Sequence, residues 1–143
     1  MTRVAVLFGG ISAEREVSLV SGEKVVVALR EAGFDVVPVE VNEDLGAMIA
    51  TLVAEKPDAV FNALHGRFGE DGTIQGVLDW LGLPYTHSGA RASNMAMDKA
   101  IAKTMFAAAG LPVPRGRTVE MAELEAGDPL PLPYVVKPVN EGS

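Results

Sequence analysis

The stretch VAVLFGGISAEREVSLVSG, residues 4–22, decides the fold, because a strand, a glycine turn and a helix follow one another in it directly. Residues 4–8 are continuous, short and apolar, and glycine stops them, which predicts a buried strand. A helix is then expected from Ser12 or Ala13 to about Ala32, with Ser12 as the better N-terminal cap. This stretch is therefore predicted to form a strand that is connected to a helix by a tight glycine turn.

The same alternation continues through the first 88 residues. Pro38, within the second apolar run, argues for an edge strand or an irregular one. Strands that alternate with helices predict parallel pairing and an α/β fold, here a Rossmann-like domain over residues 1–88. The further expected elements are strands at 34–41 and 58–64, helices at 45–56 and 73–82, and a short strand around 84–88.

The sequence changes character at Gly89, and we place a domain boundary near residue 88. The remaining unit, 89–143, has about 55 residues, which is roughly the lower limit for independent folding. It ends in what reads as a loop, so we expect it to be the beginning of a larger domain. Its expected elements are a helix at 94–109, strands at 115–121 and 134–138, and a proline-rich loop at 125–133.

Composition narrows the classes of function. The chain has 143 residues, a formal net charge of −7 and no cysteine. The negative charge disfavours nucleic acid and anionic membranes as partners. The lack of cysteine excludes disulfides, thiolate nucleophiles and cysteine-based zinc sites. No signal peptide or membrane-spanning run is visible in the sequence, so we expect a cytoplasmic protein.

The first glycine turn does not match a dinucleotide-binding loop. Gly9 and Gly10 are followed by Ile11, Ser12, Ala13 and Glu14, so the G-x-G-x-x-G pattern fails. Acids in a first helical turn also oppose a pyrophosphate, although they suit the helix dipole. Two interpretations stay open at this point: a plain tight turn, or a site in which Glu14 holds a cation such as a substrate ammonium group. The loop follows a parallel strand, where α/β proteins bind ligands.

A second loop, ALHGRFGEDGTIQG at 63–76, also follows a predicted parallel strand. Its four glycines indicate positive φ angles or a backbone that must approach something closely. Asp71 is expected to cap the helix that starts near Gly72. His65 stands at the end of the strand, where it is either a proton donor to a ligand or a loop residue that hydrogen-bonds locally.

The second unit offers two lysines. Lys99 points away from the apolar stripe of its helix and by itself reads as part of a solvated face. Lys137 ends an apolar run next to the NEGS segment, where it is either a surface lysine or a point charge for a phosphate. Gly142 and Ser143 are small residues whose backbone amides could cradle phosphate oxygens.

Taken together and in order, five segments resemble the D-alanine–D-alanine ligase family of ATP-grasp enzymes. The resemblance extends over the whole chain, and HGRFGEDGTIQG is its most specific piece. It implies that residues 89–143 begin the central ATP-grasp domain. The five segments are LFGGISAEREVSLVSG, ALHGRFGEDGTIQGVLDWLGLPYTHSG, MDKAIAK, GLPVP and VVKPVNEGS.

The resemblance implies a reaction and the residues that serve it. ATP phosphorylates the carboxylate of one D-alanine, and the amine of a second attacks the acyl phosphate to give D-alanyl-D-alanine for peptidoglycan synthesis. Glu14 matches the residue that orients the first ammonium, with Ser18 as its support. His65 matches a histidine near the developing acyl phosphate, and Ser143 a serine close to the second D-alanine.

For the nucleotide, the resemblance implies that Lys99, Lys137, Gly142 and Ser143 bind ATP. It also implies Mg²⁺, whose ligands are expected beyond residue 143, so that none is assigned within this segment. The segment alone is accordingly expected to be inactive, because phosphoryl transfer needs the metal and all of the positioned charges. A homodimer is the expectation that the family suggests.

The alternatives differ in the second substrate or in the class of protein. A D-alanine–D-lactate ligase or another ATP-grasp carboxylate–amine ligase shares the fold. A non-catalytic α/β ligand-binding module and a nucleotide-binding oxidoreductase domain are the rivals from other classes, and the failed glycine pattern counts against the oxidoreductase.

Overall fold

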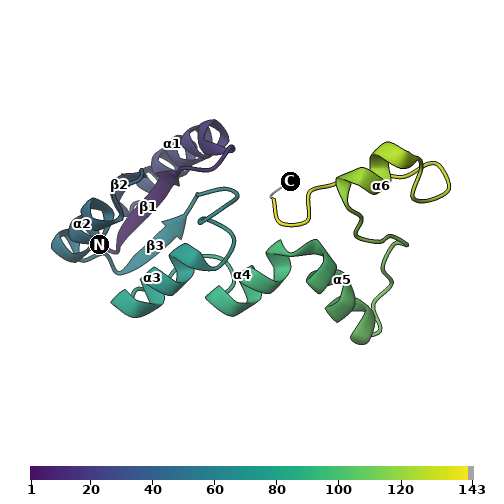
Figure 1. The fold of residues 1–143 in the computed structure, drawn as a ribbon. Helices are drawn as coiled ribbons and strands as arrows, with labels where there is room; N and C mark the ends of the chain where they lie inside the picture. The colour runs from purple at the N-terminus through teal and green to yellow at the C-terminus, as the bar shows by residue number, and fades with distance from the viewer. Residues whose placement is uncertain (142–143) are drawn as a thin grey trace.

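The computed structural model describes residues 1–141 and has an α/β architecture around a three-stranded parallel sheet of order β2-β1-β3 (Figure 1). The predicted parallel α/β fold is thereby confirmed. The strands are β1 (Arg3–Gly9), β2 (Asp35–Val41) and β3 (Ala59–Asn62), and the helices are α1 (Arg15–Glu31), α2 (Leu45–Glu55), α3 (Thr73–Leu81), α4 (Ala90–Met97), α5 (Lys99–Ala108) and α6 (Met121–Ala126).

The central strand β1 supplies both faces of the core. Ala5 and Leu7 are fully buried with residues of α2 and α3, whereas Val6 is fully buried on the other face, with Val26 of α1. Successive side chains of a strand point to opposite faces, so an unbroken apolar run suits a strand that is covered on both sides. Helix α1 therefore covers one face of the sheet, and α2 and α3 cover the other.

Helix α1 lies unusually close to β1 because of a glycine. A β-carbon built on Gly22 would overlap the β-carbon of Phe8. No side chain fits between the two backbones here, so only glycine lets the helix reach this position. The close packing fixes the start of α1, which carries Glu14 at its N-cap, against the end of β1.

Several local predictions are confirmed and others are wrong. Pro38 lies in β2, which is an edge strand as expected.

The single helix predicted at 94–109 is instead two helices, because Asp98 has an extended backbone between them. The carboxylate of Asp98 accepts hydrogen bonds from Ala100 N and Ile101 N at the start of α5. The strand around 84–88 is reduced to one bridge, between Tyr85 and Val60.

The strands predicted at 115–121 and 134–138 are wrong for the part of the chain that the structure describes. Residues 111–120 and 134–138 have no regular secondary structure, and Met121 already begins α6. A strand needs a neighbour to pair with, and neither segment lies in the sheet. The boundary between 1–88 and 89–143 stays a prediction.

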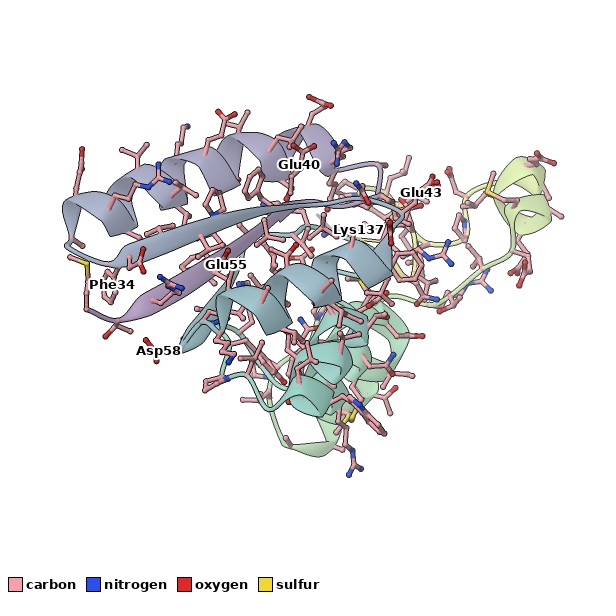
Figure 2. All side chains as sticks on the ribbon, turned by 90° about the vertical axis from the view of Figure 1, so that its left-hand side faces the viewer. Phe34, Glu40, Glu43, Glu55, Asp58 and Lys137 are labelled. Atoms are coloured by element: carbon pink, nitrogen blue, oxygen red, sulfur yellow. The ribbon has the colours of Figure 1, made fainter. Side chains whose placement is uncertain are left out.

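The C-terminal segment returns to the carboxyl ends of the strands (Figure 1). In Figure 2, Lys137 lies toward the end of the sheet where Glu40 and Glu43 are labelled, away from Phe34 and Asp58 at its other end. Across residues 1–141, no helix combines the length and the apolar character that crossing a membrane requires.

Candidate functional site

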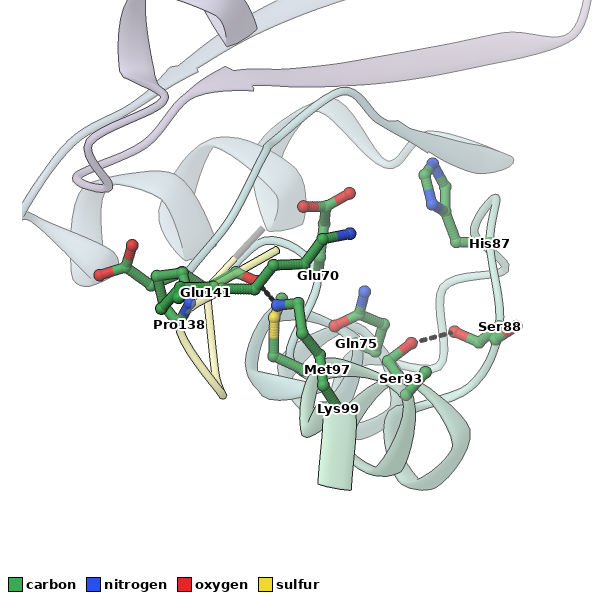
Figure 3. A pocket seen from close by; sticks show the side chains of 12 residues that line it. Glu70, Gln75, His87, Ser88, Ser93, Met97, Lys99, Pro138 and Glu141 are labelled. Atoms are coloured by element: carbon green, nitrogen blue, oxygen red, sulfur yellow. Dashed lines mark hydrogen bonds between the residues drawn. The ribbon is translucent and has the colours of Figure 1, made fainter. Parts of the chain in front are cut away.

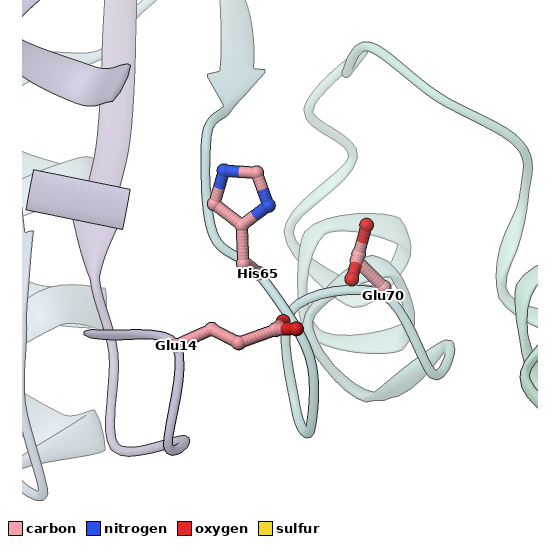
Figure 4. Close-up of side chains that lie close together, drawn as sticks. All are labelled: Glu14, His65 and Glu70. Atoms are coloured by element: carbon pink, nitrogen blue, oxygen red, sulfur yellow. The ribbon is translucent and has the colours of Figure 1, made fainter. Parts of the chain in front are cut away.

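Two loops that follow neighbouring parallel strands bring three polar side chains together. Glu14 comes after β1, while His65 and Glu70 come after β3 (Figure 4). One ligand atom from each of these three residues lies within 4.8 Å of the others, and all three side chains are half-buried. The carboxyl edge of a parallel sheet is where such loops converge. The sequence placed Glu14 and His65 on these loops, and the structure shows that they meet.

The first loop is tied to the second by Ser12. Its hydroxyl donates to the carbonyl oxygen of His65 at 2.7 Å and accepts from the backbone N–H of Glu14 at 3.2 Å. The predicted cap thus lies two residues ahead of the N-cap, which is Glu14. The imidazole of His65 is also placed, since its Nε2 lies 3.3 Å from the hydroxyl of Ser21 on α1. These contacts hold Glu14 and His65 in one arrangement.

Ser18 lies in the first turn of α1, next to Glu14 in the helix, and is fully buried. Its hydroxyl donates to Ala63 O at 2.6 Å and accepts from Gly9 N at 2.9 Å. The expected support of Glu14 by the Ser18 side chain is therefore indirect, because the hydroxyl joins the ends of β1 and β3 instead. Only the backbone of Ser18 bonds to Glu14, in the first turn of α1. A direct contact between Ser18 and substrate stays a prediction.

The second loop is held by amide side chains from both of its ends. Asn62 Nδ2 and Gln75 Nε2 donate to the same carbonyl oxygen, that of Gly69, at 2.8 and 2.9 Å. Glu70 Oε2 accepts from Gly66 N at 2.7 Å, which closes the turn that follows His65. The loop with the most specific sequence is thus cross-linked by hydrogen bonds, and Glu70 is one of its fixed points.

Asp71 bonds to the backbone at the start of α3, but the N-cap of that helix is Gly72, so the predicted cap lies one residue ahead of it. Its carboxylate accepts from Phe68 N at 2.9 Å and from Thr73 N at 3.0 Å. Partial burial acts to raise the pKa of Asp71, but these hydrogen bonds favour the charged form and lower the pKa below its ordinary value. Both oxygens of the Asp71 carboxylate thus bond to backbone N–H groups of its own loop.

A pocket of about 660 Å³ opens beside this loop, between α3, α4 and the C-terminal segment (Figure 3). Lys99 and Lys137 both line it, although 38 residues separate them in the sequence. Lys99 Nζ donates to Glu141 O at 2.5 Å, and Lys99 N donates to Val139 O at 3.1 Å. The lining residues are Glu70, Gln75, His87, Ser88, Ser93, Ala96, Met97, Lys99, Val136, Lys137, Pro138 and Glu141.

Glu70 connects the two parts of the site, because it belongs to the group with Glu14 and His65 and also lines the pocket. One side of the site therefore offers carboxylates, which suit an ammonium group, and the other offers two lysines, which suit carboxylate or phosphate. A small zwitterion, with an ammonium group at one end and a carboxylate at the other, matches this division of charge.

Sequence reasoning missed Glu70 and Gln75 as residues of the site. Glu70 was visible only as one acid in a glycine-rich loop, and Gln75 falls inside a predicted helix. A usable signal was their position in the most specific motif of the chain. Gly142 and Ser143, which were predicted to bind ATP, lie outside the described residues.

Comparison with known proteins gives one family. The family model described as "D-ala D-ala ligase N-terminus" matches residues 3–49 and 45–88. The D-alanine–D-alanine ligase of Acidiphilium cryptum is 70% identical over 143 residues, which are 100% of this chain and 47% of that protein. The ligase of Granulibacter bethesdensis is 67% identical over 141 residues, or 99% of this chain and 46% of that protein.

Solved structures agree with the sequence matches. A crystal structure of D-alanine–D-alanine ligase from Bacillus anthracis has a TM-score of 0.77 and 35% identity, covering 100% of this chain and 47% of that one. The same enzyme complexed with ATP has a TM-score of 0.77 and 34% identity, with coverage of 99% and 48%. The chain thus spans about half the length of the relatives that it matches.

Proposed function

This chain belongs to the D-alanine–D-alanine ligase family, and from that membership we propose that the whole protein joins two D-alanines in an ATP-dependent reaction. The first D-alanine is phosphorylated on its carboxylate, and the amine of the second displaces phosphate from the acyl phosphate. The products are D-alanyl-D-alanine, ADP and phosphate, and the dipeptide serves peptidoglycan synthesis. The observation that carries the proposal is the approach of Glu14, His65 and Glu70 within 4.8 Å beside a pocket with two lysines.

In this proposal Glu14 binds the ammonium group of the first D-alanine. A carboxylate and an ammonium form a charge-assisted hydrogen bond, which fixes one end of a small substrate. His65 then stands near the carboxylate that becomes the acyl phosphate, where a donor stabilises the negative charge that develops. The hydrogen bonds of Ser12 support this geometry, because they connect the backbone of Glu14 to the backbone of His65.

Lys99 and Lys137 hold the phosphates of ATP in the same proposal. They line one pocket from different elements, α5 and the segment that follows α6. In the described part of the chain neither ammonium group forms an ion pair, so both charges can serve a ligand. Gly142 and Ser143 complete the phosphate site as further proposed residues.

No residue of the described chain is assigned as a ligand of Mg²⁺. Glu14, His65 and Glu70 are the described residues close enough to share a metal ion, but Mg²⁺ prefers an octahedral set of oxygen ligands and this group includes an imidazole. Glu70 also uses Oε2 on the loop backbone. The ligands of Mg²⁺ are therefore expected beyond residue 143.

The family also suggests where and in what form the protein acts. It is expected to act in the cytoplasm and as a homodimer.

The test is an assay of the whole protein with ATP, Mg²⁺ and D-alanine, in which phosphate release and dipeptide are both measured. Stoichiometric D-alanyl-D-alanine is the expected result, with none formed from L-alanine. Folded protein that binds ATP but releases no phosphate with D-alanine would contradict the proposal. D-lactate as the competing second substrate distinguishes a ligase that makes an amide from one that makes an ester.

A further inference from the structure

The side chain of His65 is held next to a serine of α1. Its backbone is fixed first, because the carbonyl oxygen of His65 accepts a hydrogen bond from Ser12 Oγ at 2.7 Å. Its ring is fixed separately, since Nε2 lies 3.3 Å from Ser21 Oγ. Ser12 belongs to the loop after β1, whereas Ser21 lies within α1. The imidazole thus meets the hydroxyl of Ser21 with one defined nitrogen.

The hydroxyl of Ser21 has one proton, and the helix already uses it. Ser21 Oγ donates to Val17 O, one helical turn earlier, at 2.9 Å. A hydroxyl offers one donor and two acceptor lone pairs, so Oγ can donate to Val17 and accept from Nε2 at once. This arrangement makes two hydrogen bonds, whereas donation to Nε2 would make only one. The contact at 3.3 Å is therefore Nε2–H of His65 donating to Ser21 Oγ.

The same contact fixes the orientation of the ring. If the ring were turned over, carbon Cε1 would face the Ser21 hydroxyl, and the hydrogen bond would be lost. With Nε2 at Ser21, the other ring nitrogen is Nδ1. Figure 4 shows this second nitrogen on the side of the His65 ring that faces Glu70. Nδ1 therefore lies on the side of the ring where the carboxylates of the site gather.

We propose that Ser21 is a positioning residue for His65: it keeps the proton of the neutral ring on Nε2 and directs Nδ1 to the carboxylate of the first D-alanine. The inference rests on the proposed ligase function and adds to it the atom through which His65 acts. Nδ1 carries a lone pair in the neutral ring and a proton in the imidazolium, whereas Nε2–H bonds to Ser21 in both. Donation to the developing acyl phosphate therefore comes from Nδ1–H of the imidazolium.

The position of Ser21 depends on how closely α1 approaches the sheet. The residue after it, Gly22, packs against Phe8 of β1 at a distance that leaves no room for a β-carbon. The tautomer of a histidine is set by the hydrogen bond that its other nitrogen makes, so the distance between α1 and the His65 loop matters. One hydrogen bond shifts such an equilibrium by up to about tenfold.

The first measurement is nitrogen-15 NMR of the whole protein, labelled at histidine and free of substrates, with His65→Ala to assign the signals. At a pH where the ring is neutral, a proton is expected on Nε2 and none on Nδ1. In Ser21→Ala the Nε2 signal is expected to shift and the second tautomer to appear, because the acceptor is gone. A wild-type ring protonated at Nδ1, or signals that Ser21→Ala leaves unchanged, would overturn the inference.

Steady-state kinetics of the whole protein measure the consequence for the reaction. Ser21→Ala is expected to lower kcat about tenfold, the size of one lost hydrogen bond, and to leave the constants of ATP and of the first D-alanine within about twofold. Ser21→Thr keeps the hydroxyl and is expected to retain most of kcat. Thr51→Ala is the matched control with unchanged kcat, since it removes a hydroxyl that bonds one turn back on α2 in the same way.

A double-mutant cycle shows whether Ser21 acts through His65. In the His65→Ala background, Ser21→Ala is expected to lower kcat no further, because the ring that it positions is absent. A further tenfold loss in that background, or a Ser21→Thr variant as slow as Ser21→Ala, would overturn the inference. A wild-type protein that gives the expected ring signals but makes no dipeptide would instead refute the proposed function, since the NMR measurement needs no turnover.

Discussion

Glu14 and Gly66 lie so close together that a β-carbon built on Gly66 would stand 2.8 Å from Glu14 Oε2. The two residues come from different loops, one after β1 and one after β3. The missing side chain at Gly66 thus leaves room for the carboxylate that is proposed to hold the first D-alanine. Gly66 also has a φ of +67°, which L-amino acids rarely adopt.

Gly66→Ala is expected to displace Glu14 and to weaken the binding of the first D-alanine by about tenfold or more, because a charge-assisted hydrogen bond loses its geometry. Backbone strain alone costs about 1–2 kcal/mol of stability. Gly82→Ala is the matched control, since Gly82 has the same φ of +67° and a β-carbon added there would meet nothing within 4 Å. Equal losses of D-alanine binding in both variants would contradict this explanation.

Glu14→Gln is expected to raise the constant of the first D-alanine by roughly 10- to 100-fold and to leave that of ATP within about twofold, because only the ammonium contact loses its charge. Steady-state kinetics of the whole protein measure both constants. Glu16→Gln removes an exposed carboxylate in the same helical turn and is expected to change neither. An unchanged D-alanine constant in Glu14→Gln would exclude the ammonium anchor.

Lys137→Ala is expected to raise the ATP constant by about tenfold, as the loss of one charged contact to a phosphate predicts. The binding of a fluorescent ATP analogue reports this directly. Lys24→Ala removes the same charge from the exposed face of α1 and serves as the control. ATP binding that falls equally in both variants would reflect net charge and not a specific contact.

Ser18→Ala is expected to lower the free energy of unfolding by about 1–3 kcal/mol, because Gly9 N and Ala63 O both lose their buried partner. Urea unfolding followed by circular dichroism measures the difference. Thr51→Ala, which removes a hydroxyl bonded to Ala47 O on α2, is expected to cost less than about 0.5 kcal/mol. A Ser18 variant as stable as the Thr51 variant would refute the buried bridge.

The lowered pKa of Asp71 predicts a stability that depends on pH. Its contribution is complete above the ordinary value of 3.8 and is lost as the pH falls through the lower folded value. Wild type is expected to exceed Asp71→Asn by about 0.5–1 kcal/mol at pH 7, and the gap is expected to close on acidification below about pH 4. Urea unfolding from pH 7 to pH 3 measures it, and a gap that stays constant would contradict the assignment.

The sheet domain could be predicted from sequence because its signals are local. A continuous apolar run that ends in glycine predicted β1, and Pro38 predicted the edge position of β2. The placement of Glu14 and His65 followed from one geometric rule, that loops after parallel strands share an edge. Their contacts with Ser12 required the three-dimensional structure.

The parts that could not be predicted depend on partners that are distant in sequence. The segment 134–138 is apolar enough for a strand but has no strand to pair with in the described chain. Ser18 was expected to support Glu14, one turn away in the same helix, and only the approach of β3 shows that its hydroxyl is buried and bonds to Ala63 O. Asp98 carried a readable signal, because aspartate is a preferred N-cap, but the helical period continued through it.

The single extended residue at Asp98 turns the chain between the elements that supply the acids of the site and those that supply its lysines. Glu14 and Glu70 come before this turn, whereas Lys99 and Lys137 come after it. Because α5 starts in a new direction, its first residue lies beside the C-terminal segment, where Lys99 N donates to Val139 O and Lys99 Nζ to Glu141 O. One residue outside the helices thus decides where the first lysine of the pocket stands.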